Sequence, residues 1–216
     1  MNYSAVIFDM DGLLFDTEIV YYEASQAIAD KMGIPYDKEL YLRFLGVSDE
    51  EVWANYHEIY AEYGEETVQA FIDDSYQETL RRFASGQVQL KPGVHELLAF
   101  LEEKNVPKVV ASSNKRKIIE LLLEKNNLLH RFETIVSAEN VERAKPDPEI
   151  FLQAHKYLGT PKEQTLILED SQNGVLAAFA AEIPVVMIPD LLSPSKELAK
   201  KTIGVVSSLH EVPPIF

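Results

Sequence analysis

Short apolar runs alternate with amphipathic stretches along most of the chain, and this alternation predicts the fold class. The apolar run at 6–8 stops at Asp9-Met10-Asp11-Gly12, which is typical of a buried strand that ends in a glycine turn. Further strands are expected at 109–111, 134–136, 166–168, 185–187 and 204–206, with helical patterns between them. Strands that alternate with helices indicate an α/β fold with a doubly wound parallel sheet, whose ligands bind at the carboxyl ends of the strands.

The stretch from 16 to 85 is helical only. Thr17 and Glu18 suit a helix start, and Gly33 ends the helix after an apolar stripe of Val20, Ala24, Ala27 and Ile28. Ser48 and Glu51 form a capping box before the next helical pattern, and another helix is expected from about 65 to 83. This block interrupts the sheet pattern after its first strand. We therefore expect an inserted helical domain at 16–85 within an α/β core made of 1–15 and 86–216.

Composition agrees with a globular protein of this kind. The 216 residues are 46% hydrophobic and 25% charged, which allows an ordinary buried core. The chain has no cysteine, so disulfides, thiolate metal sites and a cysteine nucleophile are excluded. The first residues lack a basic region, and no apolar stretch approaches transmembrane length. We expect a soluble, cytoplasmic protein.

The charge is strongly acidic, and most of it lies in the helical block. The formal net charge is −15, and residues 16–85 hold 16 acidic against 5 basic side chains. Such a balance disfavours nucleic-acid backbones and anionic membrane surfaces as partners. We expect neither nucleic acid nor membrane as a partner, and a monomer as the default oligomeric state.

The unusual polar residues collect where strands end. In a parallel sheet these ends converge on one edge, which would hold four carboxylates, one ammonium and several hydroxyl and amide groups. They are Asp9, Asp11, Ser112, Ser113, Asn114, Lys145, Glu169 and Asp170.

A phosphate and a hard cation fit this collection of groups. Clustered carboxylates repel one another unless a cation intervenes, and octahedral Mg²⁺ takes one or two carboxylates with substrate phosphate and water. Ser112 and the amides that open the next helix suit a phosphate oxygen. Lys145 would neutralise both a carboxylate nucleophile and a transferring phosphoryl group.

Each motif also has an ordinary structural explanation. Asp9 to Gly12 could be a turn with a cap, and Lys145 a solvated loop lysine. Ser112 to Asn114 could cap the next helix, which uses the same geometry as phosphate binding. The five histidines show no metal-ligand spacing, and Trp53 fits helical packing as well as a substrate cage.

Together the motifs resemble those of the haloacid dehalogenase superfamily, in the phosphatase branch that includes β-phosphoglucomutase. The first motif is the stretch from Asp9 to Glu18, DMDGLLFDTE. The others follow in order as Ser112 after a strand, KPDPEIF from Lys145, and EDSQNG from Glu169. The likeness spans about 6–187 and implies a Rossmann-like core with a helical cap inserted after the first motif.

The resemblance implies a role for each polar residue. Asp9 is the nucleophile that takes the phosphoryl group, and Asp11 is the general acid and then the base, with a carbonyl that binds Mg²⁺. Ser112, with the neighbouring Ser113 and Asn114, and Lys145 hold phosphate. Asp170 binds the metal and Glu169 supports it. An acid at Asp11 favours phosphoryl transfer, since a dehalogenase expels halide and needs no proton donor there.

Departures from the family pattern bear on the substrate. β-Phosphoglucomutase-like enzymes carry basic cap residues where this chain has Leu45 and Asp49, and a histidine where it has Tyr21. These losses favour a phosphatase acting on a small phosphorylated metabolite, with sugar phosphates as the first choice by resemblance. The mutase stays the alternative, because Arg43, Arg81 or Arg82 could hold a second phosphate.

Two alternative functions, from other classes of protein, stay open. A regulatory protein could bind phosphate with little turnover, although the complete motif set argues against it. A phosphorelay receiver domain combines similar groups, but it is about half as long and carries its phosphorylated aspartate after the third strand.

Overall fold

The chain forms two compact units. The computed structural model describes residues 3–45, 47 and 49–216. One unit consists of Met1–Asp16 and Gln89–Phe216, and the other of Thr17–Val88. The helical segment is therefore an insertion between the first strand and the rest of the α/β unit.

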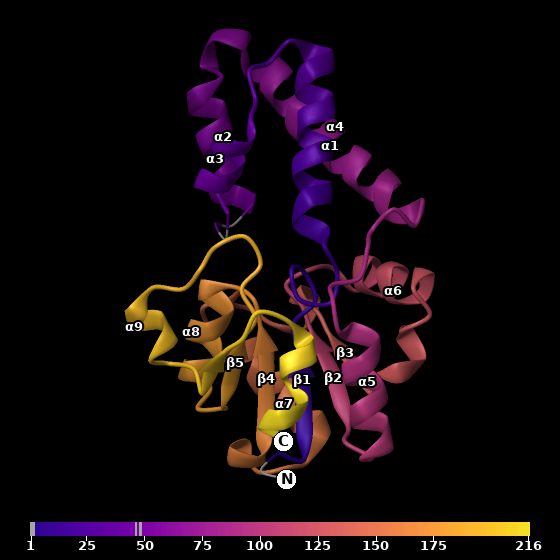
Figure 1. Cartoon of the computed structure of the whole chain (residues 1–216). Helices are drawn as coiled ribbons and strands as arrows, with labels where there is room; N and C mark the ends of the chain where they lie inside the picture. The colour runs from indigo at the N-terminus through magenta and orange to yellow at the C-terminus, as the bar shows by residue number, and fades with distance from the viewer. Residues whose placement is uncertain (1–2, 46, 48) are drawn as a thin grey trace. The chain divides into compact units, whose positions relative to one another are not determined.

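A six-stranded parallel sheet forms the centre of the α/β unit (Figure 1). The strand order is β3-β2-β1-β4-β5-β6. The bounds are β1 Ala5–Phe8, β2 Lys108–Ala111, β3 Thr134–Val136, β4 Thr165–Glu169, β5 Val185–Met187 and β6 Gly204–Val205. β1 pairs with β2 on one side and with β4 on the other, with Ile7 opposite Val109 and Ile167. The fold class predicted from the sequence is confirmed.

Helices cover both faces of the sheet, which is why its central strands are apolar on both sides. Helices α7 (Glu149–Leu158) and α8 (Gln172–Ala180) pack against the face that carries Ile7, Val109 and Ile167. Helix α5 (Val94–Glu103) and the C-terminal turns lie over the other face, which carries Lys108 (Figure 1). The remaining helices are α6 (Arg116–Lys125) and the short α9 (Lys196–Ala199). Short 3₁₀ turns in this unit span Leu129–Arg131, Ala138–Asn140, Lys162–Gln164, Leu209–Glu211 and Pro213–Ile215.

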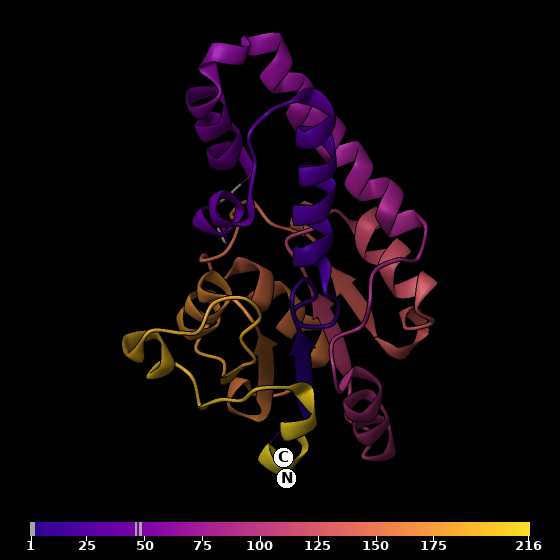
Figure 2. The ribbon, with the colours of Figure 1, turned by 45° about the horizontal axis from the view of Figure 1, so that its top comes forward.

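The helical unit has its own core. It contains α1 (Thr17–Met32), α2 (Lys38–Arg43), α3 (Asp49–Ile59), a 3₁₀ turn at Ala61–Tyr63, and α4 (Glu65–Ala84). Helices α1 and α4 lie side by side in both views (Figure 2). Tyrosine and phenylalanine rings fill its centre, and the Tyr36 and Tyr56 hydroxyls lie 3.3 Å apart. Burial raises the pKa of both phenols, so these rings act as packing groups.

Several expectations differ from the structure in detail. Ala27 is exposed, and Ala29 takes its place in the buried stripe of α1. Helix α7 begins at Glu149, whose N–H donates a hydrogen bond to Asp147 Oδ1 at 3.0 Å. The six-residue helix α2 was not expected from the pattern. Ser48 of the expected capping box lies outside the described residues.

No helix among the described residues combines the length and the apolar character that crossing a bilayer requires.

Candidate active site

The polar residues meet where the direction of winding reverses. The chain builds β1, β2 and β3 outward on one side and then returns to place β4 on the other side of β1. At this switch point the backbone N–H of Asp9 donates to the Leu168 carbonyl at 3.0 Å, so the first residue after β1 is fixed beside the end of β4. Ligands of open α/β sheets bind in the crevice that such a reversal leaves.

A buried ion-pair triad occupies this point. Lys145 Nζ donates to Asp9 Oδ1 at 2.6 Å and to Glu169 Oε1 at 2.8 Å. The side chains of Asp9, Lys145 and Glu169 are 8%, 7% and 1% exposed, so water screens these charges little. The ammonium also lies 4.8 Å from the centre of the Phe151 ring, on α7. Asp9 Oδ2 forms no hydrogen bond with any residue that the structure describes.

The protonation of this triad follows from burial and from its charges. Burial raises the pKa of the Asp9 carboxyl to about 8; Lys145 opposes the rise, and Glu169 and Asp11 add to it. Burial alone would lower the pKa of Lys145, but Asp9 and Glu169 outweigh it and the net direction is upward. The neighbouring carboxylates thus favour the charged form of Lys145, whereas burial favours the neutral form of Asp9.

Glu169 is held by the start of α8. Its Oε2 accepts hydrogen bonds from the Ser171 N–H at 2.7 Å and from the Ser171 hydroxyl at 3.0 Å. The same hydroxyl caps α8 by accepting from the Gly174 N–H at 3.0 Å. A Cβ on Gly174 would lie 1.7 Å from Glu169 Oε1, so only glycine fits there. Both carboxylate oxygens of Glu169 are thus engaged within the protein.

Asp11 is bound by the loop after β2. Its Oδ2 accepts from the Ser112 hydroxyl at 3.1 Å and from Asn114 Nδ2 at 2.9 Å. Ser112 is fully buried and its hydroxyl also accepts from the Asn114 N–H at 3.1 Å. Ser113 is exposed and forms no hydrogen bond with another described residue. Of the four residues expected to bind phosphate, Ser112 and Asn114 therefore lie at Asp11, Ser113 faces solvent, and Lys145 pairs with Asp9 and Glu169.

Three carboxylates could share a cation. Among the described residues, oxygens of Asp9, Glu169 and Asp170 lie within 4.8 Å of one another. Asp170 packs against the turn after β1: a Cβ on Gly12, whose φ is +77°, would lie 2.3 Å from Asp170 Oδ2. Because Glu169 is occupied by Lys145 and Ser171, Asp9 and Asp170 are the better direct ligands. All-oxygen donors of this kind suit Mg²⁺, and the raised pKa of Asp9 fits a site completed by a cation.

The structure adds residues to which the sequence pattern assigned no role. Gly12 and Gly174 belong to the recognised motifs. Because they lack a Cβ, they leave room for the side chains of Asp170 and Glu169. Phe151 lies beneath the Lys145 ammonium. Their positions depend on how α7 and α8 approach the sheet, which helical spacing does not reveal.

The arginines that could bind a second phosphate differ in their surroundings. Arg81 and Arg82 both pair with Glu78 within α4, at 2.6 and 2.9 Å. Arg43 is exposed and forms no ion pair with the described residues. Tyr21 packs edge-to-face on Phe83, with ring centres 5.5 Å apart.

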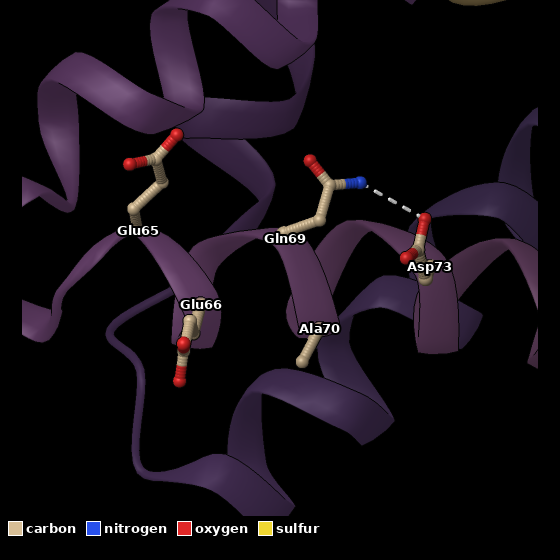
Figure 3. A pocket seen from close by; sticks show the side chains of 5 residues that line it. All are labelled: Glu65, Glu66, Gln69, Ala70 and Asp73. Atoms are coloured by element: carbon tan, nitrogen blue, oxygen red, sulfur yellow. Dashed lines mark hydrogen bonds between the residues drawn. The ribbon is translucent and has the colours of Figure 1, made fainter.

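A surface depression on the helical unit carries no comparable chemistry. It lies along the first half of α4, where Gln69 Nε2 donates to Asp73 Oδ1 at 3.0 Å (Figure 3). Its lining consists of Glu65, Glu66, Gln69, Ala70 and Asp73. Acidic side chains on an open helix surface are ordinary solvated groups.

Comparison with known proteins shows similarity to a family of hydrolases that includes phosphatases. The family model for haloacid dehalogenase-like hydrolases matches residues 6–188. A phosphorylated carbohydrates phosphatase of Thermotoga maritima is 35% identical over 182 residues, covering 83% of this chain and 82% of that protein. A "probable pseudouridine-5'-phosphatase" of Drosophila melanogaster is 34% identical over 217 residues, covering 96% and 90%. The crystal structure of a Thermotoga maritima protein named after β-phosphoglucomutase is 31% identical, with a TM-score of 0.83 over 98% of this chain and 97% of that one.

Proposed function

The chain belongs to the haloacid dehalogenase-like hydrolases, in the phosphatase branch that resembles β-phosphoglucomutase, and on this premise we propose that it hydrolyses a phosphorylated carbohydrate through an aspartyl-phosphate on Asp9. The observation that carries the proposal is the Asp9–Lys145–Glu169 triad. It presents a buried carboxylate with one oxygen bound to an ammonium and the other without a hydrogen bond to the described residues.

In the first half-reaction Asp9 Oδ2 attacks the phosphorus atom of the substrate. The bond from phosphorus to the ester oxygen breaks, and that oxygen takes a proton from Asp11. The product of this step leaves as an alcohol. Before the substrate binds, Ser112 and Asn114 hold Asp11 in place by donating hydrogen bonds to its Oδ2. Lys145 stays protonated and offsets the charge of Asp9 and of the phosphoryl oxygens.

In the second half-reaction Asp11 works in reverse. It accepts a proton from water while the water oxygen attacks the phosphorus of the aspartyl-phosphate, and Asp9 leaves as a carboxylate. Asp9, Asp170 and the Asp11 carbonyl would hold Mg²⁺, supported by Glu169. When bound, the cation supplies positive charge that favours ionised Asp9 and neutralises the phosphoryl oxygens.

We assign phosphate binding to Ser112, Ser113, Asn114 and Lys145, and substrate selection to the helical unit as a cap. Support for a carbohydrate substrate comes from the phosphorylated carbohydrates phosphatase, the most informative of the named relatives. Support for hydrolysis over mutase chemistry comes from α4, where Glu78 pairs with Arg81 and Arg82 and Glu23 pairs with Arg82, so both arginines already have carboxylate partners.

Turnover with Mg²⁺ tests the proposal. The protein would be assayed for phosphate release from a panel of sugar and nucleotide monophosphates, with Asp9→Asn as the control. We expect release from one or more sugar phosphates by the wild type and none by Asp9→Asn, because an amide cannot form the acyl-phosphate. Comparable release by a folded Asp9→Asn variant would remove Asp9 from the nucleophile role.

The mutase alternative has one observation in its favour, the 31% identical structure named after β-phosphoglucomutase. It is tested in the same assay with β-glucose 1-phosphate and a trace of the 1,6-bisphosphate. Conversion to glucose 6-phosphate without phosphate release would establish the mutase. No measurable turnover of any substrate would favour a protein that binds phosphate with little turnover.

A further inference from the structure

A fifth carboxylate, outside the family motifs quoted above, lies beside the proposed cation site. Asp190 follows β5 by three residues, and its side chain is 7% exposed. Its Oδ1 accepts a hydrogen bond from Lys91 Nζ at 2.6 Å. Lys91 also lies 3.8 Å from Asp16 Oδ1, and its backbone N–H donates to the Leu14 carbonyl at 2.9 Å. Through Lys91, one oxygen of Asp190 is thus linked to the segment that follows β1.

The other oxygen of Asp190 lacks a donor. Its Oδ2 is buried and forms no hydrogen bond with any residue in the described part of the chain. Leaving a buried acceptor unsatisfied costs roughly 1–3 kcal/mol, and more if it is charged. A polar group kept under those conditions points to a partner outside the protein.

The surroundings of this oxygen identify the partner. A Cβ on Gly12 would lie 3.2 Å from Asp190 Oδ2 and 2.3 Å from Asp170 Oδ2, so both oxygens lie within 3.2 Å of one point. Two ionised carboxylates accept hydrogen bonds and donate none, and they repel each other. A hydrated cation would supply both the positive charge and the donor that this arrangement needs.

We propose that Asp190 is a positioning residue of the cation site, and that its Oδ2 accepts a hydrogen bond from a water molecule bound to the Mg²⁺ that Asp9 and Asp170 hold. The proposal rests on the cation site of the proposed function. Direct coordination by Asp190 is not proposed, because the described carboxylates that converge within 4.8 Å are those of Asp9, Glu169 and Asp170. Mg²⁺ keeps several of its waters in protein sites, and groups that bind those waters tune its affinity.

Lys91 has a different part in this arrangement. It occupies Oδ1 of Asp190 and so leaves Oδ2 as the oxygen turned toward Asp170. In Asp190→Asn the amide oxygen would face the Lys91 ammonium, because the NH₂ group and the ammonium are both hydrogen-bond donors and repel each other. The NH₂ group would then replace Oδ2, which turns an acceptor for the water into a donor.

The test is Mg²⁺ affinity, measured by isothermal titration calorimetry without substrate, on the full chain. Asp190→Asn and Lys91→Gln break the same ion pair, but only the first removes the acceptor. Asp16→Asn removes an equal charge from the other side of Lys91. We expect Asp190→Asn to weaken Mg²⁺ binding by about 10–100-fold, the usual effect of losing a group that supports a metal ligand. Lys91→Gln and Asp16→Asn keep both carboxylate oxygens of Asp190 and should weaken Mg²⁺ binding much less.

The outcomes separate the alternatives. Equal losses in Asp190→Asn and Lys91→Gln would mean that the ion pair only fastens the loop, and would overturn the proposal. Normal Mg²⁺ binding by Asp190→Asn would overturn it too. Absence of Mg²⁺ binding by the wild type would contradict the cation site itself, and with it the proposed function. If Asp190→Asn alone does not fold, the charge-balanced Lys91→Gln/Asp190→Asn variant must show the same weakening.

Discussion

At the residue scale, two glycines decide how closely the acidic groups can approach. Gly12 leaves room for Asp170, and Gly174 leaves room for Glu169. The first contact joins segments that are far apart in the sequence, and the second depends on how the start of α8 turns back onto the end of β4. The motif pattern therefore marks these glycines, but only the approach of α8 to the end of β4 shows what each one makes possible.

Gly174→Ala should destabilise the protein and abolish the activity. An alanine inside a helix normally stabilises it by about 1 kcal/mol relative to glycine. Here the new Cβ would lie 1.7 Å from Glu169 Oε1, and Glu169 is 1% exposed with no room to turn away. Overpacking of this kind costs roughly 1–3 kcal/mol, so the clash exceeds the gain.

Chemical unfolding and phosphate release would measure both effects. Gly204→Ala is the matched control, because a Cβ there meets nothing within 4 Å. Unfolding midpoints that shift equally in the two variants, with activity kept, would show that the site tolerates the added methyl group.

Single residues also mark the limit of prediction from the sequence. Asp9, Asp11, Lys145, Glu169 and Asp170 were expected at one edge of the sheet, since strand ends of a parallel sheet converge. The hydrogen bonds that Ser112 and Asn114 donate to Asp11 were not expected, because one donor geometry serves a phosphate or a carboxylate. Asp190 also follows a strand, but its burial beside Asp170 requires the path of the loop after β5.

At the scale of elements, the start of α8 combines a helix cap with part of the site. Ser171→Ala should lower the free energy of unfolding by about 1 kcal/mol, the usual value of an N-cap. It should also reduce turnover by roughly tenfold, because Glu169 loses the Ser171 hydroxyl and keeps only the backbone N–H.

Ser195→Ala provides the comparison. Ser195 caps α9 in the same way, accepting from the Leu198 N–H at 3.1 Å, but has no contact with the triad. A loss of stability with unchanged turnover is expected for this variant. If Ser171→Ala gave the same result, the Ser171 hydroxyl would be a cap only.

Helix α4 carries the clearest pH-dependent contribution outside the site. Hydrogen bonds from Arg81 and Arg82 lower the pKa of Glu78 from 4.5 to about 2. Since the folded pKa lies below the unfolded one, the stabilisation is fully present above pH 4.5 and is lost as the pH falls toward 2. Glu78→Gln should therefore destabilise the protein by about 0.5 kcal/mol at pH 7, as for other exposed pairs, and by less at pH 3.

Urea unfolding at the two pH values would check this, with Asp74→Asn as an exposed control on the same helix. A difference between wild type and Glu78→Gln that stays constant from pH 7 to pH 3 would contradict the assignment.

The long elements were predictable, and the short ones were not. A buried apolar run that meets a glycine turn identifies β1, and helical spacing identifies α4 to within one residue at its end. Helix α2 has six residues and buries none of them fully, so it leaves no apolar stripe to detect.

At the scale of the whole molecule, the charge opposes the substrate that the site accepts. The formal net charge is −15, whereas a phosphorylated substrate is itself an anion. Under the proposed function, Lys145 and a bound cation would attract phosphate, but their field acts over a short range. The net charge acts over the Debye length, which is about 30 Å at 0.01 M salt and about 10 Å at 0.1 M.

The kcat/KM for a phosphorylated substrate should therefore rise several-fold as NaCl increases from about 0.01 to 0.1 M, with Mg²⁺ held at saturation. Salt shortens the range of the repulsion during encounter, while the interactions inside the dry triad are screened little, so kcat should stay constant. A fall of kcat/KM with salt would mean that the local positive field of Lys145 and the cation controls encounter. In that case the net charge of the acidic surface has no influence on how fast the substrate is captured.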